Sequence, residues 1–379
     1  MTAETALSNA RIVLANEIVE GSLVLRDGSI AGIDAGGSRS GEDMGGDYVI
    51  PGLVELHTDH LEGHYAPRPK VRWNPIAAVL AHDAQVATAG ITTVLDALRV
   101  GMDEDADLTL ADIRKLADAI EDSVAQDRLR ADHFVHLRCE VSAPDCLQAF
   151  ADFDRDDRVK LASLMDHAPG QRQFVNLETY AYYYQRKLKL TDRDFKLFCE
   201  KRMAESARYS APNRAVIAAA CRERGIVLAS HDDATSGHVD EAIEQGVRVA
   251  EFPTTEEAAR ASKAAGLGVL MGAPNVMRGA SHSGNVSARA LAGDGLLDIL
   301  SSDYIPFSLI QSAFFLGDMV EGISLPQAVA MVSKNPAEAV GLTDRGVIEQ
   351  GRRADLVRVR VDDHVPVVRT VWRQGRRVA

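Results

Sequence analysis

Apolar and polar positions alternate over short stretches at both ends of the chain. Near the N-terminus the runs ARIVLAN and GSLVLRDGSIAGID are bounded by Gly, Asp and Asn, and the C-terminal stretch ADLVRVRVDDHVPVVRTVWRQGRRVA shows the same period. Such alternation between turn residues is typical of short β-strands. Residues 1–50 and 341–379 are therefore expected to meet in one small β domain, a β-sandwich, although they lie at opposite ends of the chain.

The middle of the chain, residues 51–340, has a different pattern, in which strand-like apolar runs alternate with helix-like segments. The eight strand-like runs are VELHTD, TTVLDAL, HFVHLRCEV, VKLASLMDH, GIVLASHDD, VRVAEFP, LGVLMGAPN and LDILSSD. Eight strands alternating with helices predict an α/β fold, a (β/α)8 TIM barrel, which typically takes about 250 residues. A doubly wound sheet is the alternative, but no Gly-rich phosphate loop follows the first strand.

Several helix boundaries can be predicted from residue types. Asn74 and Pro75 suit an N-cap and a first helical position, and they precede the run IAAVLAHDAQVATAG. Thr254 and Glu257 have the spacing of a capping box. The pair Asn335–Pro336 is expected to open a short helix in NPAEAVGL.

One segment, residues 168–212, is too long to be a simple loop after the fourth strand. It contains the run YAYYYQRKLKL. We expect either a lid over the barrel mouth or a helical excursion on the surface, and the sequence favours neither.

Composition excludes several classes of protein. The hydrophobic content of 46% and the charged content of 26% are ordinary for a soluble globular enzyme. No apolar run approaches the about 18 residues of a membrane span, and no signal peptide is expected, so a cytoplasmic location is predicted. The four cysteines have no CxxC spacing and are expected to be inert thiols.

The net charge of −13 argues against a nucleic-acid partner. It also means that a polyanionic substrate would need metal ions or a basic pocket. The expected partner is a small molecule, and a homodimer is left open.

Polar residues gather where the predicted strands end, which is where barrel enzymes place their active sites. Alternation along the first strand places Glu55, His57 and Asp59 on the inner face, with Val54 and Leu56 toward the outer helices. A His and a carboxylate two residues apart on one strand can hold one metal ion.

The third strand has a similar pattern, because His136, Arg138 and Glu140 share its inner face. A buried carboxylate must be paired or metal-bound, so Glu140 is either a ligand or the ion-pair partner of Arg138. Other strand ends carry further candidates, and the whole expected metal-ligand set is His57, Asp59, Glu140, His167, His231 and Glu251. The expected cofactor is one or two divalent ions, with zinc favoured.

The segments VIPGLVELHTDH, SHDD, SSDY, NPAEAVGL and GVIEQGRRADLV resemble the amidohydrolase superfamily over nearly the full chain. The resemblance implies that His57, Asp59 and His231 are metal ligands and that Asp303 is the acid/base. The chain departs from the commonest pattern, because it has HTD rather than HxH and Glu251 where a sixth-strand His is usual.

A bridging lysine is also missing from a suitable position. Lys160 precedes Asp166 by six residues, or about 20 Å along an extended strand, which places it at the wrong end of the barrel. Glu140 is therefore the better candidate for a bridge between two metal ions.

Longer stretches, SLMDHAPGQRQF, AEFPTTEEAA and MGAPNVMRGASHSGNVSA, resemble one family in this superfamily, the α-D-ribose 1-methylphosphonate 5-triphosphate diphosphatases of phosphonate degradation. The resemblance implies hydrolysis of a phosphorylated ribose to its 5-phosphate and pyrophosphate. Arg172, Arg278 and His282 lie in Gly-containing loops and are the expected phosphate contacts. The alternatives are a C–N hydrolase, such as a deacetylase or cyclic amide hydrolase, and a catalytically silent barrel used as a scaffold.

Overall fold

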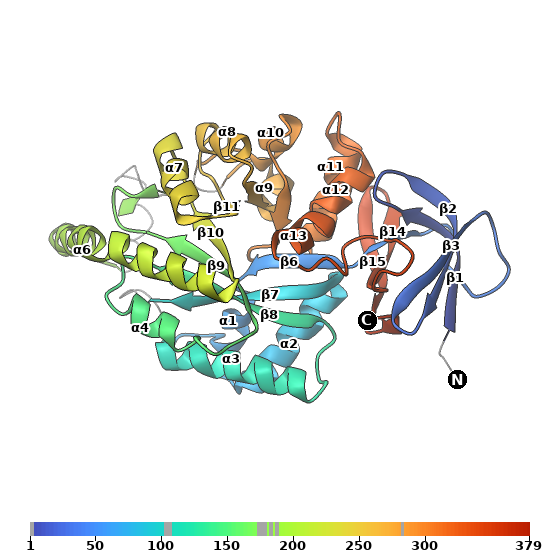
Figure 1. Cartoon of the computed structure of the whole chain (residues 1–379), viewed down its shortest axis with the longest axis horizontal. Helices are drawn as coiled ribbons and strands as arrows, with labels where there is room; N and C mark the ends of the chain where they lie inside the picture. The colour runs from blue at the N-terminus through green and yellow to red at the C-terminus, as the bar shows by residue number, and fades with distance from the viewer. Residues whose placement is uncertain (1–3, 102–107, 173–179, 182–184, 186–188, 282–283) are drawn as a thin grey trace.

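The computed structural model describes residues 4–101, 108–172, 180–181, 185, 189–281 and 284–379. Its centre is a sheet of eight parallel strands that follow one another in chain order. Helices cover the outside of this sheet, and a second sheet lies at one end of the molecule (Figure 1). The barrel strands are β6 (Leu53–Thr58), β7 (Ile91–Val100), β8 (Asp132–Glu140), β9 (Val159–Met165), β10 (Val227–His231), β11 (Val249–Glu251), β12 (Gly268–Gly272) and β13 (Ile299–Ser301).

The first and last of these strands approach each other and nearly close the barrel. Thr58 and Asp303 form an isolated parallel bridge, and the Asp303 backbone N–H donates to the His57 carbonyl at 3.2 Å. The Glu55 carboxylate adds a second link, because it accepts from the Ser302 backbone N–H at 2.6 Å. The predicted (β/α)8 barrel, with all eight of its strands, is therefore confirmed.

The helices alternate with the strands, as expected. They are α1 (His60–Tyr65), α2 (Pro75–Thr88), α3 (Leu110–Ala125), α4 (Cys146–Ala151), α6 (Asp192–Arg224), α7 (Ser236–Gln245), α8 (Glu256–Ala264), α9 (Ala273–Arg278), α10 (Ala288–Gly293), α11 (Ser308–Met319), α12 (Leu325–Ala330) and α13 (Lys334–Ala339). None of the described helices is both long and apolar enough to cross a bilayer.

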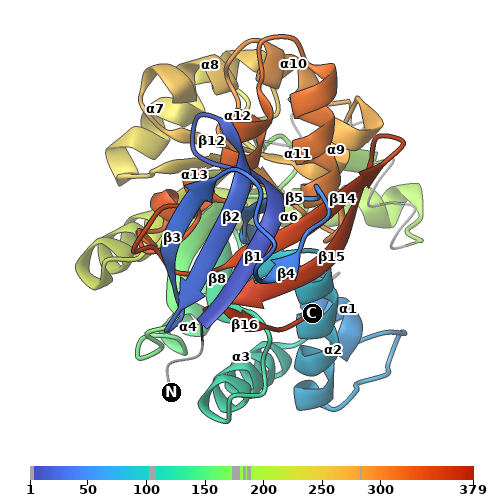
Figure 2. The same ribbon diagram turned by 90° about the vertical axis from the view of Figure 1, so that its right-hand side faces the viewer.

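The second sheet combines both ends of the chain, as predicted (Figure 2). Its strands form one hydrogen-bonded path, β16-β15-β14-β5-β1-β2-β3, with β4 paired to β1. Leu7, Ile12, Leu23 and Trp372 are among the residues of its buried core. The strands are β1 (Glu4–Val13), β2 (Ile18–Arg26), β3 (Ser29–Ala35), β4 (Glu42–Asp43), β5 (Tyr48–Pro51), β14 (Leu356–Asp362), β15 (Val365–Arg373) and β16 (Arg376–Arg377).

One predicted helix start is confirmed and two need correction. Asn74 caps α2 and its side chain accepts from the Ala77 N–H at 3.0 Å. The N-cap of α8 is Thr255 rather than Thr254, whose hydroxyl is buried and donates to the Asp233 carbonyl. The short helix expected at Asn335–Pro336 is present as α13, but it begins one residue earlier, at Lys334, and the Asn335 amide donates to the Asp298 carbonyl at 2.8 Å.

The segment 168–212 is helical in its second half, where α6 begins at Asp192. This helix packs onto the ends of β8 and β9: Arg202 donates to the Ser142 hydroxyl at 3.2 Å, and Ser206 donates to Asp166 at 2.8 Å. Residues 173–179, 182–184 and 186–188 lie outside the described part, so a lid stays a prediction.

Candidate metal centre

Three of the barrel strands are followed by an unusual backbone turn. Asp232 after β10, Phe252 after β11 and Asp303 after β13 have φ values of 61°, 55° and 55°. A non-glycine residue in this left-handed region costs about 1–3 kcal/mol, which the surrounding structure must offset. Strained residues of this kind cluster at functional sites, and here they surround the C-terminal mouth of the barrel.

The first group of candidate ligands is His57, His136 and Glu251, whose ligand atoms lie within 4.8 Å of one another. All three side chains are buried. One Glu251 oxygen lies 2.7 Å from His57 Nδ1, and the other accepts from the Ser163 hydroxyl at 2.7 Å. Burial opposes the charged carboxylate, but His57 and His136 outweigh it and hold the pKa of Glu251 below its ordinary value.

This group contains one more hydrogen-bond acceptor than the neighbouring donors can satisfy. His136 Nδ1 lies 2.9 Å from the Leu56 carbonyl, which can only accept, so Nδ1 carries the proton. His136 Nε2 then faces the Ser163 hydroxyl at 2.5 Å as an acceptor. Ser163 has one proton for two acceptors, Glu251 and His136, and burial, as the main cause, lowers the pKa of His136 to about 3. A cation would satisfy the remaining lone pair.

The second group is His167, His231 and Asp232, again with ligand atoms within 4.8 Å. His231 Nδ1 and Asp232 Oδ2 are buried 2.8 Å apart as an ion pair, but neither atom makes a hydrogen bond of regular geometry with a described residue. Unsatisfied buried acceptors cost about 1–3 kcal/mol each, so this pair also fits a metal ion. The His57 and His231 ring centroids lie 5.8 Å apart, which makes the two groups neighbours in one centre.

Glu140 holds His167 of the second group in position. Its carboxylate lies 2.6 Å from His167 Nδ1 and accepts from the Ser142 hydroxyl at 2.7 Å. Burial lowers the pKa of His167, but Glu140 and Asp232 outweigh it and raise that pKa to about 10. In the metal-free protein His167 is therefore charged, and a bound cation would compete with its proton.

Of the predicted ligands, five lie in or against this centre: His57, Glu140, His167, His231 and Glu251. Asp59 belongs to neither group. It precedes α1, and its carboxylate pairs with Arg138 Nη1 at 3.1 Å. The sequence placed His136 on the inner face of its strand without giving it a role, and it gave none to Asp232.

The expected alternation along the first strand is wrong. Val54 and Leu56 were expected to face the outer helices, but they pack in one buried cluster with Ala229 and Val249. Those two residues precede His231 and Glu251 by two positions on their strands and so face inward. The cause is local, because the β6–β7 register shifts between Leu53 and Val54 and again between Glu55 and Thr58.

Asp303, the predicted acid/base, lies beside the centre and is partly buried. Burial is the main cause that raises its pKa, while the nearby His57 lowers it and Asp59 raises it further. A carboxylate with a raised pKa suits proton transfer near neutral pH. Lys160 is near the start of β9, as expected, and its ammonium lies 5.9 Å from the Phe134 ring.

The predicted phosphate contacts have different surroundings. Arg172 is buried, and its guanidinium pairs with Asp233 and with Glu241. Arg278 is the exposed last residue of α9 and forms no ion pair with any residue that the structure describes. His282 lies outside the described residues.

Two arginines that sequence reasoning did not select lie at the strand ends. Arg99 of β7 lies 3.8 Å from the Glu140 carboxylate, and Arg138 of β8 pairs with Asp59. The buried Arg138 Nε has no hydrogen-bond partner among the described residues. Because β7 adjoins the first barrel strand β6 and β8 adjoins β7, these guanidinium groups add positive charge at the mouth. Arg99 was detectable by the alternation argument already applied to the third strand.

Comparisons with known proteins identify the family of this chain. The amidohydrolase family matches residues 85–379. An alpha-D-ribose 1-methylphosphonate 5-triphosphate diphosphatase of Escherichia coli (strain K12) is 50% identical over 98% of this chain and 99% of its own length.

Solved structures show the same fold at low identity. An N-acetyl-D-glucosamine-6-phosphate deacetylase from Mycobacterium smegmatis has a TM-score of 0.65 at 17% identity, with 99% of each chain covered. A 5-methylcytosine deaminase from Klebsiella pneumoniae has a TM-score of 0.65 at 15% identity, covering 99% of this chain and 98% of the other. At such identity the likeness concerns the fold alone.

Proposed function

The chain belongs to the amidohydrolase family, and we propose that it is a metal-dependent diphosphatase that hydrolyses α-D-ribose 1-methylphosphonate 5-triphosphate to the 5-phosphate and pyrophosphate. The observation that carries the proposal is the 50% identity to a diphosphatase of that name over 98% of the chain. The match covers nearly the whole of both chains and therefore extends over the loops at the barrel mouth, where substrate choice is made.

In this proposal His57, His136, Glu251, His167, His231 and Asp232 hold the metal ions, and Glu140 positions His167. The mixture of imidazole and carboxylate suits zinc, and we propose zinc as the resident ion. When bound, such an ion lowers the pKa of a coordinated water and polarises a phosphoryl oxygen.

The protein's own groups supply the proton transfer. The Asp303 carboxylate lies next to the centre, and burial keeps its pKa above the ordinary value. It accepts a proton from the attacking water, and in its protonated form it can donate to the leaving pyrophosphate. The left-handed backbone at Asp303, tied to the His57 carbonyl, fixes the direction of this carboxylate.

Binding of the polyanion is the task of the arginines. Arg278 is exposed and unpaired within the described part, so its guanidinium is available to a phosphate oxygen. Arg99 and Arg138 lie nearer the centre, where a phosphate would compete with Glu140 and Asp59 for them. Arg172 is already engaged by Asp233 and Glu241, so we assign it to holding the loop after β9 rather than to direct contact.

The location and assembly of the protein remain predictions. We propose a cytoplasmic enzyme, because the described cysteines are all free and three of them are buried. A homodimer stays open, and size-exclusion chromatography with light scattering measures it directly.

The decisive experiment follows pyrophosphate release by phosphorus NMR. Purified zinc-loaded protein is mixed with the ribose triphosphate that carries the anomeric methylphosphonate, and in parallel with an N-acyl amide and a cyclic amide. We expect equal amounts of pyrophosphate and 5-phosphate and no amide cleavage. Amide cleavage without pyrophosphate would establish the C–N hydrolase instead. Turnover of none of these substrates by metal-replete protein would contradict the proposal and favour the silent scaffold.

A further inference from the structure

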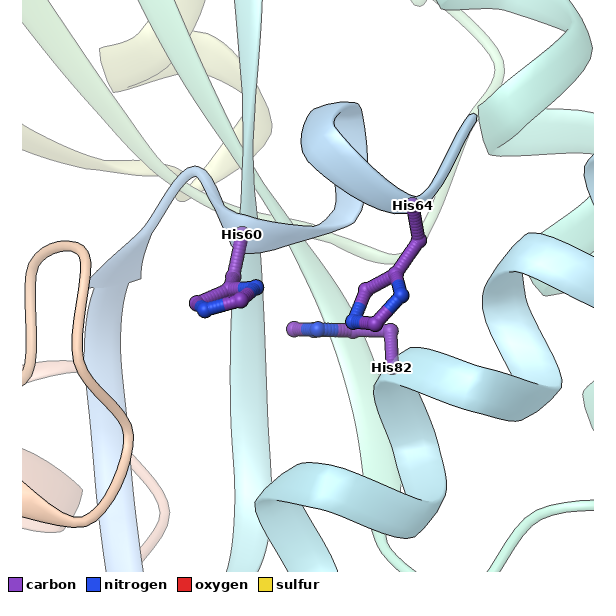
Figure 3. A group of neighbouring side chains, drawn as sticks. All are labelled: His60, His64 and His82. Atoms are coloured by element: carbon purple, nitrogen blue, oxygen red, sulfur yellow. The ribbon is translucent and has the colours of Figure 1, made fainter. Parts of the chain in front are cut away.

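A second cluster of histidines lies outside the barrel centre. His60 and His64 are four residues apart on α1, so their side chains share one face of that helix. His82 comes from α2, and the ligand atoms of the three residues lie within 4.8 Å of one another. Figure 3 shows the three rings gathered between α1 and α2. None of them belongs to the two ligand groups at the barrel mouth.

The orientation of the His82 ring is set by its hydrogen-bond partner. Its Nε2 lies 2.8 Å from the Asp96 carboxylate, and both side chains are fully buried. Burial opposes the charge on Asp96, but His133 and His82 outweigh it and bring the pKa of Asp96 down to about 2. A charged carboxylate only accepts hydrogen bonds, so His82 Nε2 is the donor, and in the neutral imidazole Nδ1 then carries a lone pair.

That lone pair is unsatisfied. His82 Nδ1 is buried and has no hydrogen-bond partner among the residues that the structure describes. Leaving a buried acceptor unpaired costs about 1–3 kcal/mol, so the position is expected to have a use.

The other two imidazoles are also suited to donate a lone pair. His64 Nε2 lies 2.9 Å from the Gln85 amide oxygen, which accepts, so its Nδ1 is free of a proton. Burial is the main cause that lowers the pKa of His60 and of His64 below the ordinary value; His82 lowers both further, and the hydrogen bond with Gln85 opposes the shift of His64. Three imidazole nitrogens within 4.8 Å of one another are stabilised by a cation between them.

We infer that His60, His64 and His82 form an additional metal site that takes a divalent transition ion of the zinc class. Zinc binds imidazole nitrogen at about 2.0–2.1 Å in tetrahedral geometry, which places ligand nitrogens about 3.3 Å apart. The ligand atoms now lie up to 4.8 Å apart. Side-chain rotations of the two partly buried histidines, His60 and His64, can shorten these distances to about 3.3 Å. Solvent at the open side supplies a fourth ligand.

The surroundings of His82 match those of a metal-binding histidine. Such a residue usually donates its other ring N–H to a carboxylate that fixes the ring, and here Asp96 does so. Asp96 is itself held by His133 at 2.7 Å, and His133 Nε2 lies 3.4 Å from Asp83. This chain of buried groups makes His82 the rigid member of the site.

The position of the site gives the ion a structural role. It would join α1 to α2 directly after Asp59, the residue that pairs with Arg138 at the barrel mouth. An ion that binds the folded chain and not the unfolded one raises the melting temperature. The inference does not rest on the proposed diphosphatase activity.

The test locates zinc in the full-length protein. Chelator-stripped protein is reloaded with a small stoichiometric excess of zinc and crystallised, and anomalous difference maps are calculated above and below the zinc edge. We expect a zinc peak between the three rings in addition to those in the barrel centre. Occupied barrel sites with no peak at the three histidines would overturn the inference, and this outcome needs no variant.

A variant and a matched control complete the test. The double variant His60→Ala, His64→Ala keeps good helix formers on α1 and should hold one zinc fewer per chain by elemental analysis. Its melting temperature should also respond less to added zinc. The control, His364→Ala, removes an exposed histidine of the small domain that pairs with Asp318, and should behave as wild type. Equal zinc content and equal response in the double variant would refute the site.

Discussion

The substitution Asp303→Asn tests the assignment of the acid/base with little disturbance of the fold. Asp303 has a φ of 55°, a region that Asn enters almost as readily as Asp, whereas Ala there would add about 1 kcal/mol of backbone strain. The backbone bond to the His57 carbonyl does not involve the side chain. Because burial raises the pKa of this carboxyl, a neutral amide is also easier to bury than the charged form.

The expected effect is therefore on rate and not on stability. General acid–base catalysis is worth about 10²–10⁴-fold, which corresponds to about 2.7–5.5 kcal/mol of transition-state stabilisation. We expect kcat to fall by that factor, with the metal content and melting temperature close to those of wild type, since Asp303 belongs to neither ligand group.

The assay is pyrophosphate release followed by phosphorus NMR, with elemental analysis of the same samples. Asp363→Asn is a matched control, because Asp363 also has a positive φ, 48°. It lies in the turn between β14 and β15, which belong to the second sheet and not to the barrel. A rate near wild type in Asp303→Asn would refute its role as the base. A rate loss that accompanies metal loss would show that Asp303 is instead a ligand.

Three further substitutions test other parts of the structure. Arg278→Ala should lower kcat/KM for the triphosphate by about 10- to 150-fold, which corresponds to the about 1.5–3 kcal/mol of a hydrogen bond to a charged group. Arg278→Lys should recover part of this loss, and steady-state kinetics measures both variants. Glu140→Gln removes the charge beside His167 and should weaken metal binding by about 10- to 100-fold in a chelator competition. Thr109→Ala removes the capping box of α3 and should lower the free energy of unfolding in urea by about 1 kcal/mol, without an effect on metal content. Unchanged values in these measurements would contradict the respective assignments.

The barrel was predictable because each of its strands is a short apolar run that ends in polar residues. The runs predicted the number and order of the strands, but seven of the eight runs extend past the C-terminal end of their strand. In GIVLASHDD the strand ends at His231, because Asp232 turns into the left-handed region. Nothing in the apolar pattern marks that turn.

Helix starts show the same limit on a smaller scale. The prediction that Asn74 is the N-cap of α2 was correct, because the proline that follows it favours the first helical position. Thr254 and Thr255 offer the same hydroxyl one residue apart, and only tertiary packing separates them. Thr254 is buried against the Asp233 carbonyl, which leaves Thr255 to cap α8.

The ligand set was predicted less completely, because spacing gives the face of a strand but not its last residue. Asp59 was placed with His57 by alternation, yet β6 ends at Thr58 and α1 begins at His60, so the rule does not reach Asp59. Arg172 was selected for its loop, while its partners Asp233 and Glu241 are 61 and 69 residues away in sequence. Pairings of that range depend on the folded barrel.

The charge of the centre implies an order of binding. Three fully buried carboxylates, Glu140, Asp232 and Glu251, keep pKa values below the ordinary range because histidines outweigh the effect of burial. The charged His167 offsets part of this negative charge, but in a chain with a net charge of −13 the centre still disfavours a triphosphate until further cations occupy it. Under the proposed function, metal ions must therefore bind first, and they convert the mouth from an anionic site to one that receives phosphate. Arg99, Arg138 and Arg278 then add charge that does not depend on pH, because a guanidinium stays protonated throughout the range in which enzymes work.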